Sequence, residues 1–350
     1  MNRPRATRFV AFAIGAVLLI DGAQVTSAQT DPTPVPATEA LAPGATATPA
    51  PPPASAQPPS VSSVKKSSAK KTTTRKRSRR RRPAAIRLPA VTPYGIPRLH
   101  VKAAYVFDAT NNRVLFQKNP ERVLPVASLT KLMTAMVFLT TNPDWDRVVE
   151  VIPEDVRNSS RTRIRSREEI TVRDLFHASL MSSDNCATKT LVRTCGVPHP
   201  EFIRRMNAMA DSLGLGSTSF VEPTGLSEQN VSTAQDMARI LRIASESPEI
   251  SAITQKLEYE FTSNRKRHHL VNTNRLLRSQ WNVTGGKTGF IREAGYCLVT
   301  NLKSPTGIDI TAVVLGAPSN TLRFAEARRI LDWTFRFGLP RAETLPPEND

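Results

Sequence analysis

Ser128 and Lys131 stand three residues apart at the start of an apolar, helix-competent run. On a helix this spacing places both side chains on one face, within reach of each other. A serine hydroxyl becomes a nucleophile when a base takes its proton, and a lysine can be that base once burial lowers its pKa. The free N–H groups at a helix start also favour negative charge developing on the serine. The pair is therefore a candidate for nucleophilic catalysis, although its spacing alone is a weak signal.

Two further short motifs follow, at Ser183-Asp184-Asn185 and at Lys287-Thr288-Gly289. With the first pair they give the order S-x-x-K, S-x-N, K-T-G, the signature of penicillin-recognising serine acyl enzymes. Three motifs in this order are far harder to obtain by chance than one, so the set predicts an enzyme that acylates on serine.

Each motif residue has an expected task. Ser128 attacks a carbonyl and becomes acylated, and Lys131 is its base. Ser183 passes a proton between Lys131 or Lys287 and the leaving nitrogen. Asn185 contacts the substrate backbone and holds Lys131 in place.

The third motif is expected to bind the substrate. Lys287 and Thr288 offer a cation and a hydroxyl to a C-terminal carboxylate. Gly289 is expected to let the substrate backbone lie flat along a strand, where a side chain would block it. The backbone N–H groups of Ser128 and Phe290 are candidates for an oxyanion hole, worth about 3 kcal/mol per donor in comparable sites.

Residues 101–338 resemble the D-alanyl-D-alanine carboxypeptidases and endopeptidases, the low-molecular-weight penicillin-binding proteins of serine peptidase family S11. The resemblance is carried by the blocks at 124–136, 180–185, 220–234 and 286–299. This combination of blocks is similar in particular to the endopeptidases of the penicillin-binding protein 7 type. The resemblance implies a β-lactamase/transpeptidase-like fold, peptidoglycan stem peptides as substrates and β-lactams as covalent inhibitors.

Two features expected of many carboxypeptidases in this family are missing from the sequence. Those enzymes carry a second, β-rich domain and a C-terminal amphipathic anchor, whereas here only a polar tail, 339–350, follows the peptidase domain. By analogy this favours the endopeptidase branch, which cleaves the D-Ala–diaminopimelate cross-link.

The hydrophobic periodicity predicts an α+β domain. A hairpin is expected over 103–116, and buried strands are expected over 294–301 and 308–316. Helices are expected between them and after them, over 128–139, 174–180, 187–192, 200–213, 234–246 and 320–337. The sheet should therefore join the two ends of the domain, in antiparallel order, with the helical region between and over it.

Residues 1–28 read as a secretory signal peptide. Three arginines precede an apolar run over 9–20, and Thr26-Ser27-Ala28 is an acceptable cleavage site. A 12-residue helix reaches about 18 Å, short of a hydrocarbon core of about 30 Å. We therefore expect export, to the periplasm, with peripheral association to membrane or wall as an open alternative.

The segments before the domain differ sharply in composition. Residues 29–64 are rich in Pro, Ala and Thr and should form a disordered tether. Residues 65–82 hold eleven basic side chains, and a linker over 83–100 leads to the domain. Export removes nucleic acid as a partner of the basic tract, which leaves anionic envelope polymers or lipid, or a solvated linker that binds nothing.

Two alternatives stay open at this point. A class A β-lactamase uses the same motifs and needs a glutamate for deacylation, and Glu222 is a candidate by position, although it also fits the peptidase block at 220–227. The other alternative is a wall-tethering module that binds peptidoglycan or penicillin without turnover. The intact motif residues argue against such an inactive protein.

The remaining reactive side chains point to no cofactor or metal. Cys186 and Cys195 would lie about 13 Å apart on one helix, too far for a disulfide, and Cys297 is expected to be a buried small hydrophobe. His268 and His269 are expected in an exposed turn without metal-ligand partners. Arg161 and Arg163 precede the second motif and are expected to border the cleft.

Overall fold

The computed structural model describes residue 95, residues 97–160 and residues 162–339. The predicted signal peptide, tether and basic tract lie outside the described residues, as do Arg161 and the tail beyond Leu339. None of the helices among the described residues combines the length and the hydrophobicity that a membrane span requires.

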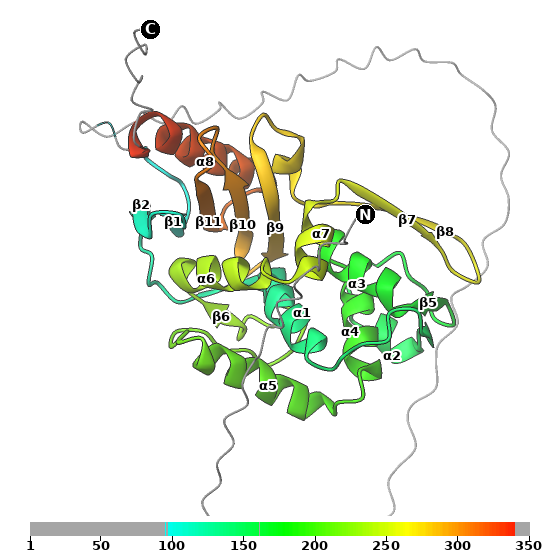
Figure 1. Ribbon diagram of the computed structural model, residues 1–350. Helices are drawn as coiled ribbons and strands as arrows, with labels where there is room; N and C mark the ends of the chain where they lie inside the picture. The colour runs from blue at the N-terminus through cyan, green and yellow to red at the C-terminus, as the bar shows by residue number, and fades with distance from the viewer. Residues whose placement is uncertain (1–94, 96, 161, 340–350) are drawn as a thin grey trace, which may run out of the picture. The chain divides into compact units, whose positions relative to one another are not determined.

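A five-stranded sheet joins the two ends of the described chain (Figure 1). Its order is β2-β1-β11-β10-β9, and every neighbouring pair is antiparallel. The strands are β1 (Ala103–Asp108), β2 (Arg113–Lys118), β9 (Asn282–Ile291), β10 (Gly295–Lys303) and β11 (Asp309–Ala317). The central β11 pairs with β1 on one side and β10 on the other, so the N-terminal hairpin and the C-terminal strands form one sheet, as predicted.

Both faces of the sheet are covered, which explains why its central strands are apolar almost throughout. Val299 and Val313 face the helical region, whereas Leu298 and Val314 belong to a second core under the C-terminal helix. This alternation is the period of two expected of strands. Helix α8 (Asn320–Trp333) packs on β10 and β11, and α6 (Ala234–Ala244) packs on β1, β10 and β11.

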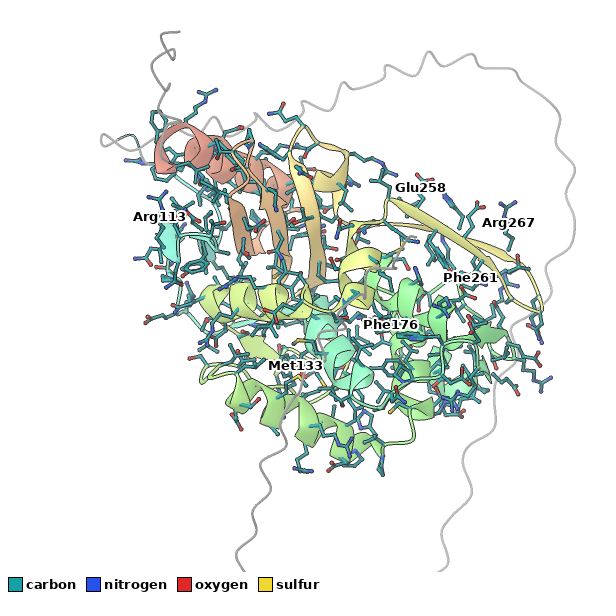
Figure 2. All side chains as sticks on the ribbon, in the orientation of Figure 1. Arg113, Met133, Phe176, Glu258, Phe261 and Arg267 are labelled. Atoms are coloured by element: carbon teal, nitrogen blue, oxygen red, sulfur yellow. The ribbon has the colours of Figure 1, made fainter. Side chains whose placement is uncertain are left out.

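The helical region lies between β2 and β9 in the chain. Its buried side chains include Met133 and Phe176, both labelled in Figure 2. Its remaining helices are η1 (Ala127–Thr130), α1 (Lys131–Leu139), α2 (Pro153–Val156), α3 (Val172–Met181), α4 (Asn185–Thr194), α5 (His199–Ser212), α7 (Pro248–Gln255) and η2 (Arg275–Arg278).

Three short two-stranded ribbons complete the region. They are β3 (Leu124–Pro125) with β6 (Val231–Ser232), β4 (Val148–Glu150) with β5 (Glu169–Thr171), and β7 (Glu258–Thr262) with β8 (Arg267–Val271).

The predicted α+β fold is confirmed, with local differences. The nucleophile run begins with a 3₁₀ turn, η1, and becomes an α-helix only at Lys131. The C-terminal helix ends at Trp333 and continues as one π-helical turn, η3 (Thr334–Gly338). Helix α7 and the β7–β8 hairpin were not predicted, because polar residues interrupt their apolar pattern. The predicted exposed turn at 268–269 is wrong, since both histidines lie on β8.

Candidate active site

The nucleophile turn is held in an uncommon backbone conformation. Ser128 lies on η1, directly after Ala127, whose φ is +50°. A positive φ is sterically unfavourable for a residue with a Cβ and persists only where the surrounding structure enforces it. The turn brings Ser128 Oγ to 3.1 Å from Lys131 Nζ.

The Lys131 ammonium group is fully buried and surrounded by acceptors. Its Nζ lies 2.6 Å from Asn185 Oδ1 and also contacts the Thr224 carbonyl. Burial lowers the pKa of Lys131 to about 7, and the charges of Glu222 and Asp184 only partly oppose this shift. A lysine in this state is available as a base near neutral pH.

The second motif connects the helical region to the sheet. Asp184 caps α4 by accepting a hydrogen bond from the Ala187 N–H, which fixes Asn185 in the first turn. Ser183 has φ of +61°, and its Oγ accepts a hydrogen bond of 2.7 Å from Lys287 Nζ. Lys287 is also buried, and its pKa is lowered by that burial and by the positive charge of Lys131.

Gly289 is required by the protein's own packing. A Cβ at this position would lie 2.9 Å from Val126 O and 3.0 Å from Ser128 N. The glycine therefore lets β9 approach the nucleophile turn. It also lines the pocket, so making room for substrate backbone stays a prediction for this residue. Next to it, Thr288 Oγ1 donates to Thr273 Oγ1 at 2.7 Å.

The block at 220–227, in which Glu222 alone was a candidate for chemistry, packs against the nucleophile turn. Gly225 has φ of +84°, and a Cβ there would collide with Ala127 O at 2.0 Å. Thr224 supplies the carbonyl that accepts from Lys131. The Pro223-Thr224-Gly225 run is the sequence signal for a tight turn here. Nothing in the sequence indicates which residues that turn would contact.

Glu222 holds this turn together. Its carboxylate accepts hydrogen bonds from the N–H groups of Thr224 and Gly225, at 2.7 and 2.5 Å, and from the Thr224 hydroxyl at 2.6 Å. Glu222 does not line the pocket at Ser128. The geometry thus gives it a structural task and removes the observation on which the class A β-lactamase alternative depended.

A pocket of about 540 Å³ opens over Ser128. Lys131 and Lys287 are buried and do not line it. The other predicted site residues all line this pocket: Ser128, Ser183, Asn185, Thr288, Gly289 and Phe290. Phe290 is half exposed at the mouth and stacks on Tyr296 with 4.1 Å between ring centroids. Sequence reasoning missed the other lining groups that could bind an anion: Arg275, Arg278 and Arg323.

Arg323 lies on α8 and is held by backbone carbonyls of β9 and β10. Its Nη1 donates to the carbonyls of Gly289 and Cys297, each at 3.1 Å, and its guanidinium lies over the Tyr296 and Phe324 rings. Burial lowers the pKa of Arg323 to about 10, so it remains a cation at neutral pH. No aspartate or glutamate lines the pocket among the described residues. The site therefore favours anionic ligands.

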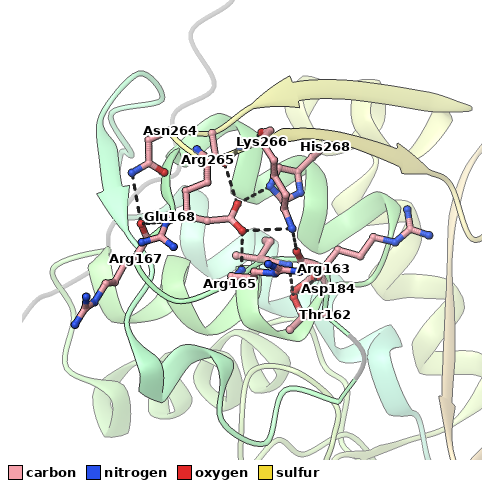
Figure 3. Close-up of polar contacts among 12 residues, drawn as sticks. Thr162, Arg163, Arg165, Arg167, Glu168, Asp184, Asn264, Arg265, Lys266 and His268 are labelled. Carbon is pink, nitrogen blue, oxygen red and sulfur yellow. Dashed lines mark hydrogen bonds and ion pairs between the residues drawn. The ribbon is translucent and has the colours of Figure 1, made fainter.

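A buried ion-pair network supports the second motif from the loop at 159–168 (Figure 3). Glu168 accepts from His268 Nε2 at 2.6 Å and from Ser263 Oγ at 3.0 Å, and both carboxylate and imidazole are almost fully buried. Burial raises the pKa of Glu168, but these hydrogen bonds outweigh it and the net shift is downward. His268 is thus a buried partner of Glu168 and does not lie in an exposed turn.

The loop connects this network to the site. Ser159 O accepts from Asn185 Nδ2 at 3.2 Å, and Thr162 Oγ1 donates to Asp184 at 2.8 Å. Ser160 lines the pocket. Arg163 lines a separate hollow of about 210 Å³ beside Asp184, so its expected place at the main cleft is not observed.

The other reactive side chains do not contribute to the pocket. Cys186, Cys195 and Cys297 are all free, and burial raises the pKa of Cys186 to about 12. Within the described ranges no cluster of three or more His, Cys, Asp or Glu residues could hold a metal ion.

The sequence of the chain is similar to those of several known proteins. The family described as D-alanyl-D-alanine carboxypeptidase matches residues 90–319. The chain is 38% identical over 242 residues to a D-alanyl-D-alanine endopeptidase of Pseudomonas aeruginosa, covering 66% of this chain and 76% of the relative. It is 36% identical over 257 residues to the Escherichia coli D-alanyl-D-alanine endopeptidase, covering 71% and 82%.

A solved structure shares the fold and is 31% identical to this chain. It is penicillin-binding protein D2 from Listeria monocytogenes in a cefotaxime-bound form, with a TM-score of 0.60 over 68% of this chain and 98% of that one. The likeness confirms the β-lactamase/transpeptidase-like fold expected from the motifs.

Proposed function

The chain belongs to the D-alanyl-D-alanine carboxypeptidase family of serine peptidases, family S11, and we propose that it hydrolyses peptidoglycan stem peptides through an acyl-enzyme on Ser128. The observation that carries this proposal is the contact of Ser128 Oγ with a buried Lys131 whose pKa is about 7. A lysine this close, with its pKa lowered by burial, is the base that a serine nucleophile requires.

Acylation proceeds by proton transfer and attack. Lys131 takes the proton of Ser128 Oγ, which attacks the carbonyl of the penultimate D-alanine. The N–H groups of Ser128 and Phe290 stabilise the resulting oxyanion. The bond to the leaving nitrogen breaks as that nitrogen receives, by way of Ser183, the proton that Lys131 took from Ser128, which returns Lys131 to its neutral form. Ser183 is held in place for this transfer by its hydrogen bond from Lys287. Water then attacks the ester, again with Lys131 as base, and releases the shortened peptide.

The substrate carboxylate next to the scissile bond is assigned to the third motif. Thr288 provides a hydroxyl, and the Arg323 guanidinium favours the negative charge. Asn185 contacts the substrate backbone, and the Phe290–Tyr296 stack forms an apolar surface at the mouth. β-Lactams present the same carboxylate and a reactive carbonyl, so they are expected to acylate Ser128.

We assign the enzyme to cross-link hydrolysis in preference to trimming of free pentapeptide ends. The two relatives reported above are named endopeptidases and are covered over more than three quarters of their length. Cleavage of the D-Ala–diaminopimelate bond uses the same acyl-enzyme, with a second stem peptide as the leaving group.

The place of action is part of this proposal. The composition of residues 1–28 supports export to the periplasm, where the substrate is found. The basic tract at 65–82 would bind anionic envelope polymers or lipid by salt-sensitive attraction.

One digest tests the activity. The chain from Gln29 onward would be incubated with cross-linked muropeptide dimers and pentapeptide monomers in one tube, with Ser128→Ala as the control. Loss of dimers with persistence of pentapeptide supports the endopeptidase assignment, and the reverse result makes the enzyme a carboxypeptidase. If neither substrate changes while penicillin labels Ser128, the non-catalytic wall-binding alternative replaces the enzyme.

A further inference from the structure

The segment that follows β8 runs along the third motif, on the side away from Phe290. Thr273 is hydrogen-bonded to Thr288. One residue later, Asn274 Nδ2 lies 2.9 Å from the position of a Cβ on Gly286. The segment thus follows β9 backwards, from Thr288 toward Gly286, before it enters η2 (Arg275–Arg278).

This direction places η2 on the leaving-group side of the site. The carboxylate beside the scissile bond is assigned above to Thr288, and Phe290 forms the mouth at the other end of the motif. Groups of the substrate beyond that carboxylate therefore extend toward η2. Arg275 and Arg278 both line the same pocket as Ser128, and no acidic side chain of the described residues lines it with them.

Arg278 is held in place from the β7–β8 hairpin. Its Nη2 donates to Glu258 Oε1 at 2.7 Å, and Glu258 accepts at its other oxygen from His269 Nε2 at 3.1 Å. Glu258 lies at the start of β7 (Figure 2). The Arg278 side chain remains half exposed, so the rest of its planar guanidinium can still bind a second carboxylate.

The two possible reactions differ in what they place here. A carboxypeptidase releases free D-alanine, which carries a single carboxylate already assigned to the third motif. An endopeptidase releases a whole second stem peptide, which carries further carboxylates at a distance from the scissile bond. Arg275 and Arg278, which lie beyond Thr288, would therefore have a substrate carboxylate to bind only in the endopeptidase reaction.

We propose that Arg278, supported by Arg275, binds a carboxylate of the acceptor stem and makes the site selective for cross-linked substrates. This proposal rests on the proposed DD-peptidase function. Arg278 is a specificity-determining residue in this view, oriented by Glu258 and distinct from the groups that act on the reacting atoms.

The test compares Arg278→Gln with a matched control, Arg267→Gln. Arg267 is paired with Glu260 on the same hairpin, is largely exposed and does not line the pocket. For each variant kcat/KM would be measured on cross-linked dimer and on pentapeptide. The ratio of the two should fall about 10-fold in Arg278→Gln, the loss expected of one charge-assisted contact, and stay at the wild-type value in Arg267→Gln. An unchanged ratio in Arg278→Gln overturns the proposal.

Amidated substrate gives an independent measurement. A dimer whose acceptor-stem carboxylates are amides should lose about the same factor with the wild-type chain, and Arg278→Gln should not reduce its cleavage further. Additive losses would show that Arg278 acts on something other than these carboxylates, and would contradict the proposal.

A binding assay separates this idea from the proposed function. Dimer and pentapeptide affinities would be measured by calorimetry with Ser128→Ala and with Ser128→Ala/Arg278→Gln. Failure of the wild type to cleave either substrate would defeat the peptidase proposal alone. Weaker dimer binding in the double variant would still support the Arg278 subsite, and equal binding would overturn it.

Discussion

Gly225 lies against the backbone of the nucleophile: a Cβ on Gly225 would be 2.7 Å from Ser128 N and closer still to the preceding carbonyl. The turn at 222–225 therefore packs directly against the nucleophile turn and supports it. The same turn supplies the carbonyl that accepts from Lys131. Nucleophile and base are thus positioned by one short segment almost a hundred residues further along the chain.

Gly225→Ala should lower the rate of acylation by penicillin at least 100-fold, because Ala127 and Ser128 must shift to admit the methyl group. The stopped-flow acylation rate measures the effect. Gly196→Ala is the matched control: Gly196 has a nearly identical φ, +82°, but nothing lies within 4 Å of its Cβ position. Equal rates in the two variants, with equal melting temperatures, would show that the collision does not matter.

The acylation rate should rise with pH through about 7 and level off above it. Lys131 acts as a base only when it is neutral, and burial brings its pKa to about 7 from an ordinary value of 10.5. Penicillin acylation between pH 5.5 and 9 provides the measurement. Lys131→Arg, which stays charged, should react about 10³-fold more slowly than the wild-type plateau and should show no rise through pH 7. A rate that falls across this range would rule out Lys131 as the base.

Glu168→Gln should destabilise the protein by about 1–3 kcal/mol at pH 7, because it removes the buried carboxylate that is hydrogen-bonded to His268 and Ser263. The pKa of Glu168 is lower in the folded chain, so its charge stabilises the fold above the ordinary pKa of 4.5 and this contribution is lost as pH falls through the lower folded value. Urea unfolding from pH 7 to pH 3 measures both effects. The variant should show a flatter decline than the wild type, and parallel curves would contradict this assignment.

Gly289→Ala distinguishes a packing role from a substrate-clearance role. If the glycine accommodates the nucleophile turn, the free energy of unfolding should fall by about 1–3 kcal/mol without any ligand present. If it only clears space for substrate, stability should be unchanged while KM rises. Thermal unfolding of the free protein decides between them. Gly216→Ala, where nothing lies within 4 Å, controls for the added methyl group.

Much of the site was predictable because its motifs combine local spacing with distinctive side chains. Ser128 and Lys131 meet through a single helical turn, and the sheet follows from apolar strands at both ends of the domain. Thr224 and Gly225 were beyond prediction, since their role is expressed in backbone contacts. A backbone carbonyl carries no sequence signal, and many residues tolerate such a position.

The Glu168–His268 pair shows a second limit. The two residues are 100 positions apart, and neither neighbourhood suggests burial. The run Arg-His-His-Leu-Val of β8 looks exposed because it begins with three polar residues, of which Arg267 and His269 are indeed exposed. His268 becomes buried only because the β7–β8 hairpin packs over the segment that carries Glu168. That packing is a tertiary contact, which local sequence does not reveal.

The pairing of β1 with β11 also has a consequence for biosynthesis. Ala103 pairs with Leu315, and the entire helical region lies between these two strands in the sequence. The emerging polypeptide must keep an apolar N-terminal strand without its central neighbour until more than two hundred further residues have been made. Such non-local closure delays native structure. Penicillin-reactive protein should therefore accumulate only after chain release, and truncation before Asp309 should leave none.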